Sequence, residues 1–279
     1  MKEYLDLVKL VMNEGVRKHS RTGIDTLSYF SAHYRVDLSK GFPLLTTKKV
    51  EWKSLLHEVL WYLSGDNHIR NLRQHTKIWD AWADEDGNLE TAYGYYWRKF
   101  PSAQKDKGGN WVVKEVDQIQ YVIDEIKRQP YSRRLVVTAW EPGNATTSKL
   151  PPCHYTYVFN VQEDRLNCHL TQRSGDIALG IPFNLAAYAM LTQIIAQQTG
   201  LKVGYFSHTI IDAHIYIADD GSPMEKYDHL KGLQEQLTRE PLPLSQLKIA
   251  DKPINELRFE DFELTGYQSH PKIRFEVAV

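Results

Sequence analysis

Residues 151–184 read PPCHYTYVFNVQEDRLNCHLTQRSGDIALGIPFN. Two runs of alternating apolar residues, 153–161 and 166–174, predict the two strands of a β-hairpin. The next run, 182–200, begins with a proline and ends with a glycine, as helices often do, and is apolar on nearly all sides. We therefore predict a hairpin followed by a buried central helix.

The register of the hairpin determines which side chains meet at its open end. A two-residue turn at 163–164 in a regular ladder would pair Cys153 with Ser174. Because Glu-Asp is not a favoured two-residue turn, a longer loop is an alternative. A one-residue bulge would instead bring Arg173 to the face of Cys153. In either register, a cysteine lies close to a side chain that can bind an anion.

Cys153 differs from the other cysteine, Cys168, which lies between apolar strand positions and is predicted to be a core residue. Two prolines fix the backbone before Cys153, and a nearby guanidinium would lower the pKa of its thiol and favour the nucleophilic thiolate. Regular alternation places Cys153 on one face and His154 on the other, so this histidine is poorly placed as the base of a Cys-His hydrolase.

The composition limits the kind of protein. The 279 residues, 42% of them apolar and 25% charged, can form one large domain, with or without a smaller insertion. A net charge of −1 argues against nucleic acid as the main ligand, whereas small anions can still bind to local arginines. No stretch resembles a signal peptide or a run of about 18 apolar residues, so we expect no membrane association.

The cysteine count and the motifs limit it further. Two cysteines without a CxxC motif do not make a disulfide framework and fit a reducing cytoplasm. The sequence contains no HExxH, GxxxxGK[ST] or GxGxxG motif, so neither a metal nor a nicotinamide cofactor is expected.

The rest of the chain predicts an α/β protein of the α+β type, with one large mixed β-sheet packed against helices. A loop-rich, aromatic and charged segment at about 83–118 predicts a small insertion subdomain within a single catalytic domain, 1–279. Helices are predicted over residues 2–18, 51–63, 66–82 and 117–129, and strands over 131–140 and 201–219.

Glu58 lies at the edge of the apolar stripe of the helix over 51–63. Partial burial there would raise the pKa of its carboxyl group and suit it to acid–base work, the alternative being an exposed helix residue. Trp79 and Trp82 are core residues or a stacking platform.

Several polar residues suit a nucleotide. Arg21 lies in a loop with a glycine, and Arg133 and Arg134 enter a strand, so these arginines either bind phosphate or are solvated surface charges. His214 and Tyr216 share a strand face and could bind a sugar hydroxyl.

Several motifs, in this order and at this spacing, resemble thymidylate synthases over nearly the whole chain, a likeness that PPCH alone would not establish. They are SRTG (20–23), PLLTTKKVEWKSLLHEVLWYLSGD, IWDAWAD, Tyr93-Gly94, YSRR, PPCH, QRSGDIALGIPFN, HTIIDAHIY and REPLPL. Departures from the family pattern are SGDNHI, YGYYWRKF and a KDKGG insertion, which lie around the predicted subdomain.

The resemblance implies conversion of dUMP to dTMP. The co-substrate would be 5,10-methylenetetrahydrofolate, which supplies both a one-carbon unit and a hydride and leaves as dihydrofolate. Cys153 would add to C6 of the uracil ring and make C5 a carbon nucleophile. Glu58 and His154 would belong to one polar network near the pyrimidine carbonyl, and Tyr93 would assist removal of the C5 proton through water.

The resemblance also implies a binding role for particular residues. The phosphate would be held by Arg21, Arg173 and Ser174, together with Arg133 and Arg134 of the partner subunit in a homodimer. The 3′-hydroxyl would be bound by His214 and Tyr216. The folate site would contain Asp176, which also borders the nucleotide, as well as Trp79, Trp82 and the C-terminal Val279.

Asn184, in the first turn of the central helix, would recognise the base. Its amide can donate to O4 of uracil and accept from N3–H, whereas a carboxylate would suit the amino group of cytosine. The alternatives are a deoxycytidylate hydroxymethylase, in which we expect Asp here, a cysteine-dependent hydrolase that needs no folate, and a non-enzymatic RNA-binding protein. The near-neutral charge disfavours the last of these as a main role.

Overall fold

A large twisted β-sheet dominates the computed structural model, which describes residues 1–20 and 22–278. In the described chain the order of its main strands is β1-β2-β9-β7-β6-β5, and β8 also pairs with β9. Strands β7 and β8 run parallel to β9 and the other pairs are antiparallel, so the sheet is mixed, as predicted. Its strands are β1 (Val16–His19), β2 (Asp25–Asp37), β5 (Val136–Thr138), β6 (His154–Gln162), β7 (Arg165–Gln172), β8 (Gly175–Asp176) and β9 (Lys202–Ile217).

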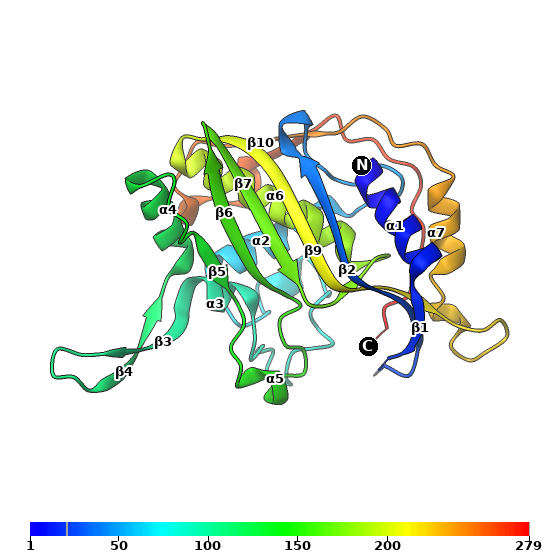
Figure 1. Ribbon diagram of the computed structural model, residues 1–279, viewed down its shortest axis with the longest axis horizontal. Helices are drawn as coiled ribbons and strands as arrows, with labels where there is room; N and C mark the ends of the chain where they lie inside the picture. The colour runs from blue at the N-terminus through cyan, green and yellow to red at the C-terminus, as the bar shows by residue number, and fades with distance from the viewer. Residues whose placement is uncertain (21, 279) are drawn as a thin grey trace.

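The core lies between this sheet and the helices behind one of its faces (Figure 1). Helix α6 (Gly180–Thr199) is the predicted central helix, and most of its side chains are buried. It ends at Gly200, whose φ of 71° lies in the left-handed region that favours glycine. The other helices are α1 (Lys2–Glu14), α2 (Trp52–Ser64), α3 (Tyr93–Lys99), α4 (Gln118–Arg128), α5 (Asn144–Thr147) and α7 (Leu230–Leu237), with 3₁₀ turns η1 (Leu38–Lys40), η2 (Leu72–Gln74), η3 (Glu225–Tyr227), η4 (Ile254–Glu256) and η5 (Phe259–Asp261).

Strands β6 and β7 form the predicted hairpin around a two-residue turn at Glu163–Asp164. The register shifts by one residue between His154 and Thr156. Beyond this bulge, the backbone N–H of Arg173 donates to the carbonyl of Cys153 at 2.8 Å. The bulged alternative is therefore confirmed, and Cys153 lies opposite this arginine rather than the serine that follows it.

The bulge also corrects the predicted face of Cys153. Regular alternation would place it on the same side as Tyr157, whose ring packs against Tyr188 of α6 at 5.1 Å. Instead, His154 contacts Tyr188, at 5.4 Å between ring centroids. Because one extra residue inverts the alternation, the side chain of His154 lies on the core side of the sheet and that of Cys153 does not.

One predicted helix was wrong, and two other elements are shorter than predicted. The helix expected over 66–82 is a series of turns containing η2, because the N–H of Ile69 and the carbonyl of Asn67 bond to residues 87–89 rather than within a helix. The strand expected over 131–140 extends only over Val136–Thr138. The first helix ends at Glu14, since β1 begins two residues later.

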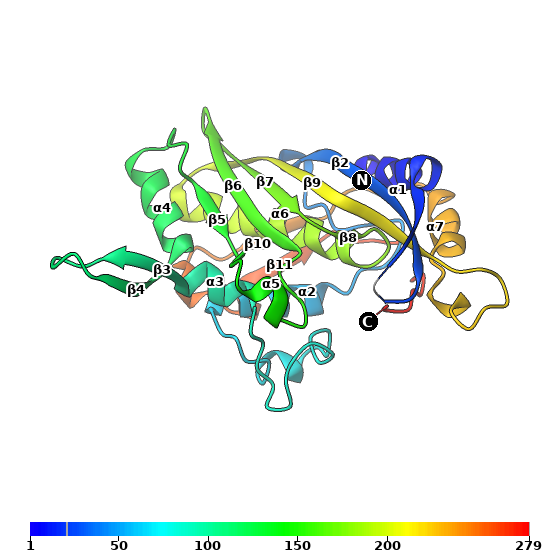
Figure 2. The same ribbon diagram turned by 60° about the horizontal axis from the view of Figure 1, so that its bottom comes forward.

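Residues 83–118 contain more regular structure than a loop-rich segment implies. Helix α3 packs near α2, and β3 (Phe100–Lys105) pairs with β4 (Trp111–Val116) in a hairpin that includes the KDKGG stretch. This hairpin projects from the body of the molecule (Figure 2). The C-terminal part adds a small sheet of β10 (Gln246–Ile249) and β11 (Phe262–Thr265).

Candidate active site

A cavity of about 610 Å³ lies where the β6–β7 hairpin, β9 and the β1–β2 loop meet. The sequence predicted five of the residues that line it: Cys153, Arg173, Ser174, His214 and Tyr216. It assigned no role to several others that contribute polar or aromatic surface, among them Lys18, Trp140, Lys149 and Asp212. Asp212 lies within the HTIIDAHIY motif, whereas Lys18, Trp140 and Lys149 belong to none of the quoted motifs and reach the cavity only through the fold.

Cys153 is partly exposed, and hydrogen bonds fix its surroundings. Its backbone N–H donates to the hydroxyl of Tyr93 at 2.8 Å. The guanidinium of Arg173 donates from Nε and Nη2 to the two proline carbonyls before Cys153, at 3.0 and 2.6 Å. Since a guanidinium has five N–H donors, Arg173 retains donors for an anion next to the cysteine.

His154 is buried and stacks on Tyr93, with 3.7 Å between the ring centroids. Its Nδ1 lies 2.8 Å from the hydroxyl of Tyr188. Burial lowers the pKa of His154 to about 3, so the imidazole is neutral at physiological pH. Burial also raises the pKa of Tyr93 well above its ordinary value, which keeps this phenol protonated.

Glu58 is only 8% exposed, on the inner side of α2. Burial raises the pKa of its carboxyl group to about 7, although two hydrogen bonds act in the opposite direction. Trp79 Nε1 and the Tyr62 hydroxyl both donate to Oε1, at 2.7 and 2.9 Å. The helix position therefore does raise this pKa, and Glu58 can exchange a proton near neutral pH.

Asp176 is the last residue of β8, shortly before α6, and its Oδ1 accepts from the N–H groups of Ala178 and Leu179 at 2.8 and 3.3 Å. Burial raises the pKa of this carboxyl group, but hydrogen bonding and the nearby His229 and His214 outweigh that effect and lower it. Asp176 is therefore ionised at neutral pH.

The other residues that the sequence predicts to bind the nucleotide also adopt defined positions. Asn184, in the first part of α6, accepts a hydrogen bond at Oδ1 from Gln172 Nε2 at 3.1 Å. His214 and Tyr216 lie on the same face of β9, as predicted, with 5.2 Å between their ring centroids. Both line the cavity.

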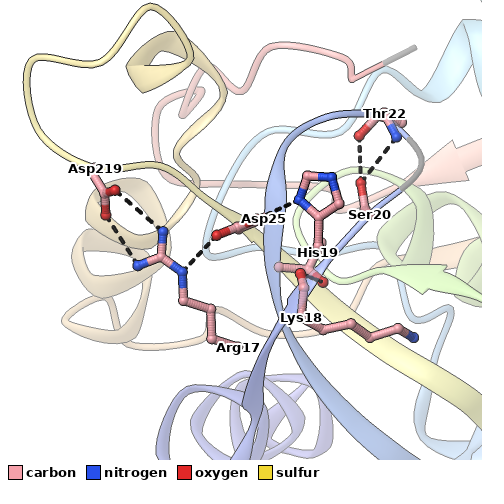
Figure 3. Close-up of polar contacts among 8 residues, drawn as sticks. Arg17, Lys18, His19, Ser20, Thr22, Asp25 and Asp219 are labelled. Atoms are coloured by element: carbon pink, nitrogen blue, oxygen red, sulfur yellow. Dashed lines mark hydrogen bonds and ion pairs between the residues drawn. The ribbon is translucent and has the colours of Figure 1, made fainter.

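Ion pairs hold the β1–β2 loop against the rest of the chain (Figure 3). Arg17 Nε donates to Asp25 at 2.7 Å, and its two terminal nitrogens donate to Asp219 at 3.1 and 3.3 Å. His19 Nδ1 lies 3.1 Å from the other oxygen of Asp25. The strands on both sides of the loop are thereby fixed.

The loop itself faces the cavity. The hydroxyls of Ser20 and Thr22 lie 2.6 Å apart, and Lys18 forms an ion pair with Asp212 of β9. Arg21, predicted to bind phosphate, lies outside the described residues.

A second cavity, of about 210 Å³, adjoins the first and shares Ser148, Lys149 and Leu150 with it. Trp79 and Trp82 line it, with 5.6 Å between their ring centroids. Val279, the other residue predicted on the folate side, lies outside the described residues.

Arg133 and Arg134 do not line either of these cavities. They are exposed and precede β5, whereas Trp140, which lines the larger cavity, follows its end. Within one chain, the structure therefore does not bring them to Cys153.

Among residues 1–20 and 22–278, no group of three or more His, Cys, Asp and Glu side chains is arranged to hold a metal ion. None of the helices found there has both the length and the apolar character needed to cross a membrane.

A mixed sheet with a polar cavity lined by an arginine and a cysteine, together with a buried carboxyl group of near-neutral pKa, defines an enzyme for a small anionic substrate. Comparison with known proteins specifies the enzyme. The family model described as thymidylate synthase matches residues 2–279. The thymidylate synthase of Haloferax volcanii is 49% identical over 326 aligned residues, which cover 98% of this chain and 95% of that protein.

The chain therefore belongs to the thymidylate synthase family, as its motifs indicated. It is a methyltransferase that converts dUMP to dTMP, and its family uses methylenetetrahydrofolate as co-substrate.

Proposed function

We propose that the chain methylates dUMP through a covalent intermediate on Cys153, with 5,10-methylenetetrahydrofolate as the donor of the one-carbon unit and the hydride. One observation carries this proposal: Cys153 and Arg173 lie opposite each other at the bulged end of the hairpin and line one cavity with His214 and Tyr216. The proposed nucleophile, the proposed phosphate-binding arginine and the two residues proposed to bind the sugar thus line the same cavity.

In this proposal the thiolate of Cys153 bonds to C6 of uracil, and the electrons of the C5–C6 double bond move towards C5 and O4. C5 then forms the new carbon–carbon bond and loses its proton through water held by the protonated phenol of Tyr93. The bond between the transferred carbon and the folate nitrogen then breaks. Hydride from the folate reduces this carbon to a methyl group, and the electron pair so delivered to the ring expels the thiolate from C6 and restores the C5–C6 double bond. Glu58, with a pKa of about 7, exchanges protons near the pyrimidine carbonyl. Neutral His154 orients the polar network to which both residues belong.

Folate would bind on the side of the second cavity. Trp79 and Trp82 offer flat apolar surface for an aromatic ring system, and ionised Asp176 can accept from the N–H groups of a pterin. When bound, the folate supplies the one-carbon unit and the hydride and leaves as dihydrofolate. Val279 would close this site.

The phosphate site is completed by a second copy of the chain. In our proposal Arg173, Ser174 and Arg21 bind the phosphate from one subunit, while Arg133 and Arg134 of the partner subunit reach it from the other. The face of the sheet opposite the helices is the proposed dimer interface (Figure 1).

The alternation of β9 supports this interface. Phe206 stacks on Tyr188 of α6, so the preceding Tyr205 points to the opposite face, where it is 37% exposed. We further propose a cytoplasmic location, which a chain with two cysteines and no disulfide framework supports.

Intact-mass analysis after incubation with 5-fluoro-dUMP and methylenetetrahydrofolate tests the covalent step. We expect an adduct that contains both ligands and is bound to Cys153, because fluorine at C5 cannot leave as a proton does. Cys153→Ser is the control and should form no adduct. An unmodified wild-type mass would refute the proposal.

Mixing inactive subunits tests the shared site. An Arg133→Ala/Arg134→Ala variant and a Cys153→Ser variant should each be inactive alone. After exchange, each mixed dimer has one complete site, so a 1:1 mixture should regain about a quarter of wild-type activity. No recovery, despite mixed dimers detected by mass spectrometry, would show that these arginines do not act across the interface.

A further inference from the structure

A chain of buried hydrogen bonds determines the orientation of the Asn184 amide. It can be followed from the carbonyl of Ser174, which accepts from Gln172 at 2.8 Å. Because a carbonyl oxygen only accepts, the atom of Gln172 that meets it is the amide nitrogen, Nε2. The amide oxygen of Gln172 therefore faces the other way, towards His208.

His208 is consequently fixed in one tautomer. Gln172 Oε1 lies 3.1 Å from His208 Nε2, which must donate to it. The other ring nitrogen, Nδ1, then has no proton and accepts from the hydroxyl of Tyr34 at 2.9 Å. The two residues are cross-strand neighbours on β2 and β9 and are only 6% and 0% exposed.

The tautomer persists because His208 stays neutral. Burial lowers the pKa of this histidine well below its ordinary value, and the neighbouring His154, His169 and His33 act in the same direction. A neutral imidazole has one donor and one acceptor, which match Gln172 and Tyr34.

At the other end of the chain, Gln172 Nε2 also donates to Asn184 Oδ1 at 3.1 Å. The oxygen of Asn184 is thereby identified, and its second lone pair can accept from N3–H of uracil while Nδ2 donates to O4. A reversed amide would instead accept from the amino group of cytosine and donate to its N3. The orientation of this amide therefore distinguishes the two bases.

We propose that Tyr34 and His208 are positioning residues for pyrimidine selectivity, which hold Gln172, and through it Asn184, in the orientation that matches uracil. The inference rests on the proposed role of Asn184 as the residue that reads the base. Tyr34 and His208 act through two intervening amides, and neither lines the nucleotide cavity described above.

Calorimetric titration with dUMP and dCMP, without folate, tests the proposal. Selectivity is the dissociation constant of dCMP divided by that of dUMP. This ratio should fall about tenfold in His208→Phe, which removes the donor to Gln172, and about threefold in Tyr34→Phe, which no longer fixes the tautomer of His208. His208→Gln retains an N–H group and should keep most of the selectivity. A folded His208→Phe protein with the wild-type ratio would overturn the proposal.

Tyr4→Phe is the matched control. Tyr4 is also fully buried and donates its hydroxyl to the carbonyl of Ile177 at 2.9 Å. This hydrogen bond does not belong to the series that connects Tyr34 with Asn184. It should lose stability as Tyr34→Phe does, but keep the wild-type ratio. An equal change of selectivity in both variants would show a general effect of lost tyrosine hydroxyls and overturn the proposal.

The tautomer of His208 can be read directly in the wild-type protein. Nitrogen chemical shifts of ¹⁵N-histidine, assigned with His208→Phe or, if that variant does not fold, with His208→Gln, should show a protonated Nε2 and an unprotonated Nδ1. The opposite tautomer would refute the hydrogen-bond assignment from Tyr34 through His208 to Gln172. This measurement needs no nucleotide, so it decides the inference separately from the proposed function, which fails if the wild-type protein does not bind dUMP.

Discussion

Replacement of Glu58 by glutamine is expected to stabilise the protein at alkaline pH while reducing its activity. The carboxyl group is 8% exposed, and its pKa is raised by burial from 4.5 to about 7. Above that pH the folded protein contains a buried charge that the two donors, Trp79 and Tyr62, compensate only in part. A glutamine oxygen can accept from both donors without carrying the charge.

The sign and size of the effect follow from proton linkage. The folded protein binds the Glu58 proton more tightly than the unfolded chain does, so the free energy of unfolding falls as pH rises from 4.5 to about 7 and stays lower above it. The difference between these pKa values corresponds to about 3 kcal/mol. Glu58→Gln should recover up to this amount at pH 8 and almost none near pH 4.5.

Urea denaturation of both proteins at several pH values between 5 and 8 measures the difference. A gain that does not depend on pH would refute the argument. Glu125→Gln on α4 is a matched control of opposite sign. Hydrogen bonds from Ser132 and Arg128 lower the pKa of Glu125, so this substitution should destabilise the protein at pH 8 and do so less as the pH falls through that lowered pKa.

Three further substitutions test the site. Cys153→Ser should lose turnover by several orders of magnitude yet still bind dUMP in calorimetry; near-normal turnover would exclude it as the nucleophile. Asn184→Asp should shift preference from dUMP towards dCMP in competition assays, and unchanged selectivity would show that another group reads the base. Tyr62→Phe removes one donor to Glu58, so the pH–rate limb assigned to this carboxyl group should move up by about one pH unit; an unmoved limb would contradict the assignment.

Signals that act over a few residues predicted much of the fold. The alternation of β7 and of β6 beyond its bulge, and the proline and glycine at the ends of α6, are local and were predicted correctly, whereas the face of Cys153 before the bulge was not. The helix expected over 66–82 failed because its polar backbone groups find partners at 87–89, and such distant partners leave no periodic signal in either segment.

The site was predicted less completely for the same reason. Gln172, His208 and Tyr34 belong to three strands, β7, β9 and β2, and each looks like an ordinary strand residue in the sequence. They become a hydrogen-bonded chain only because β9 lies between the other two strands. Neither this order nor the ion pair between Lys18 and Asp212 could be derived from spacing within one segment.

The bulge in β6 explains why the two cysteines have different environments, Cys168 in the core and Cys153 at the cavity. Cys168 follows the regular alternation of β7, and burial raises the pKa of its thiol to about 12, which makes it inert. In a regular β6, Cys153 would lie on the same core face as Tyr157. The register shift before Thr156 reverses that phase, so His154 takes the place against Tyr188 while Cys153 turns to the cavity and meets Arg173. The strand therefore contributes both to the core and to the site because its ladder is interrupted between them.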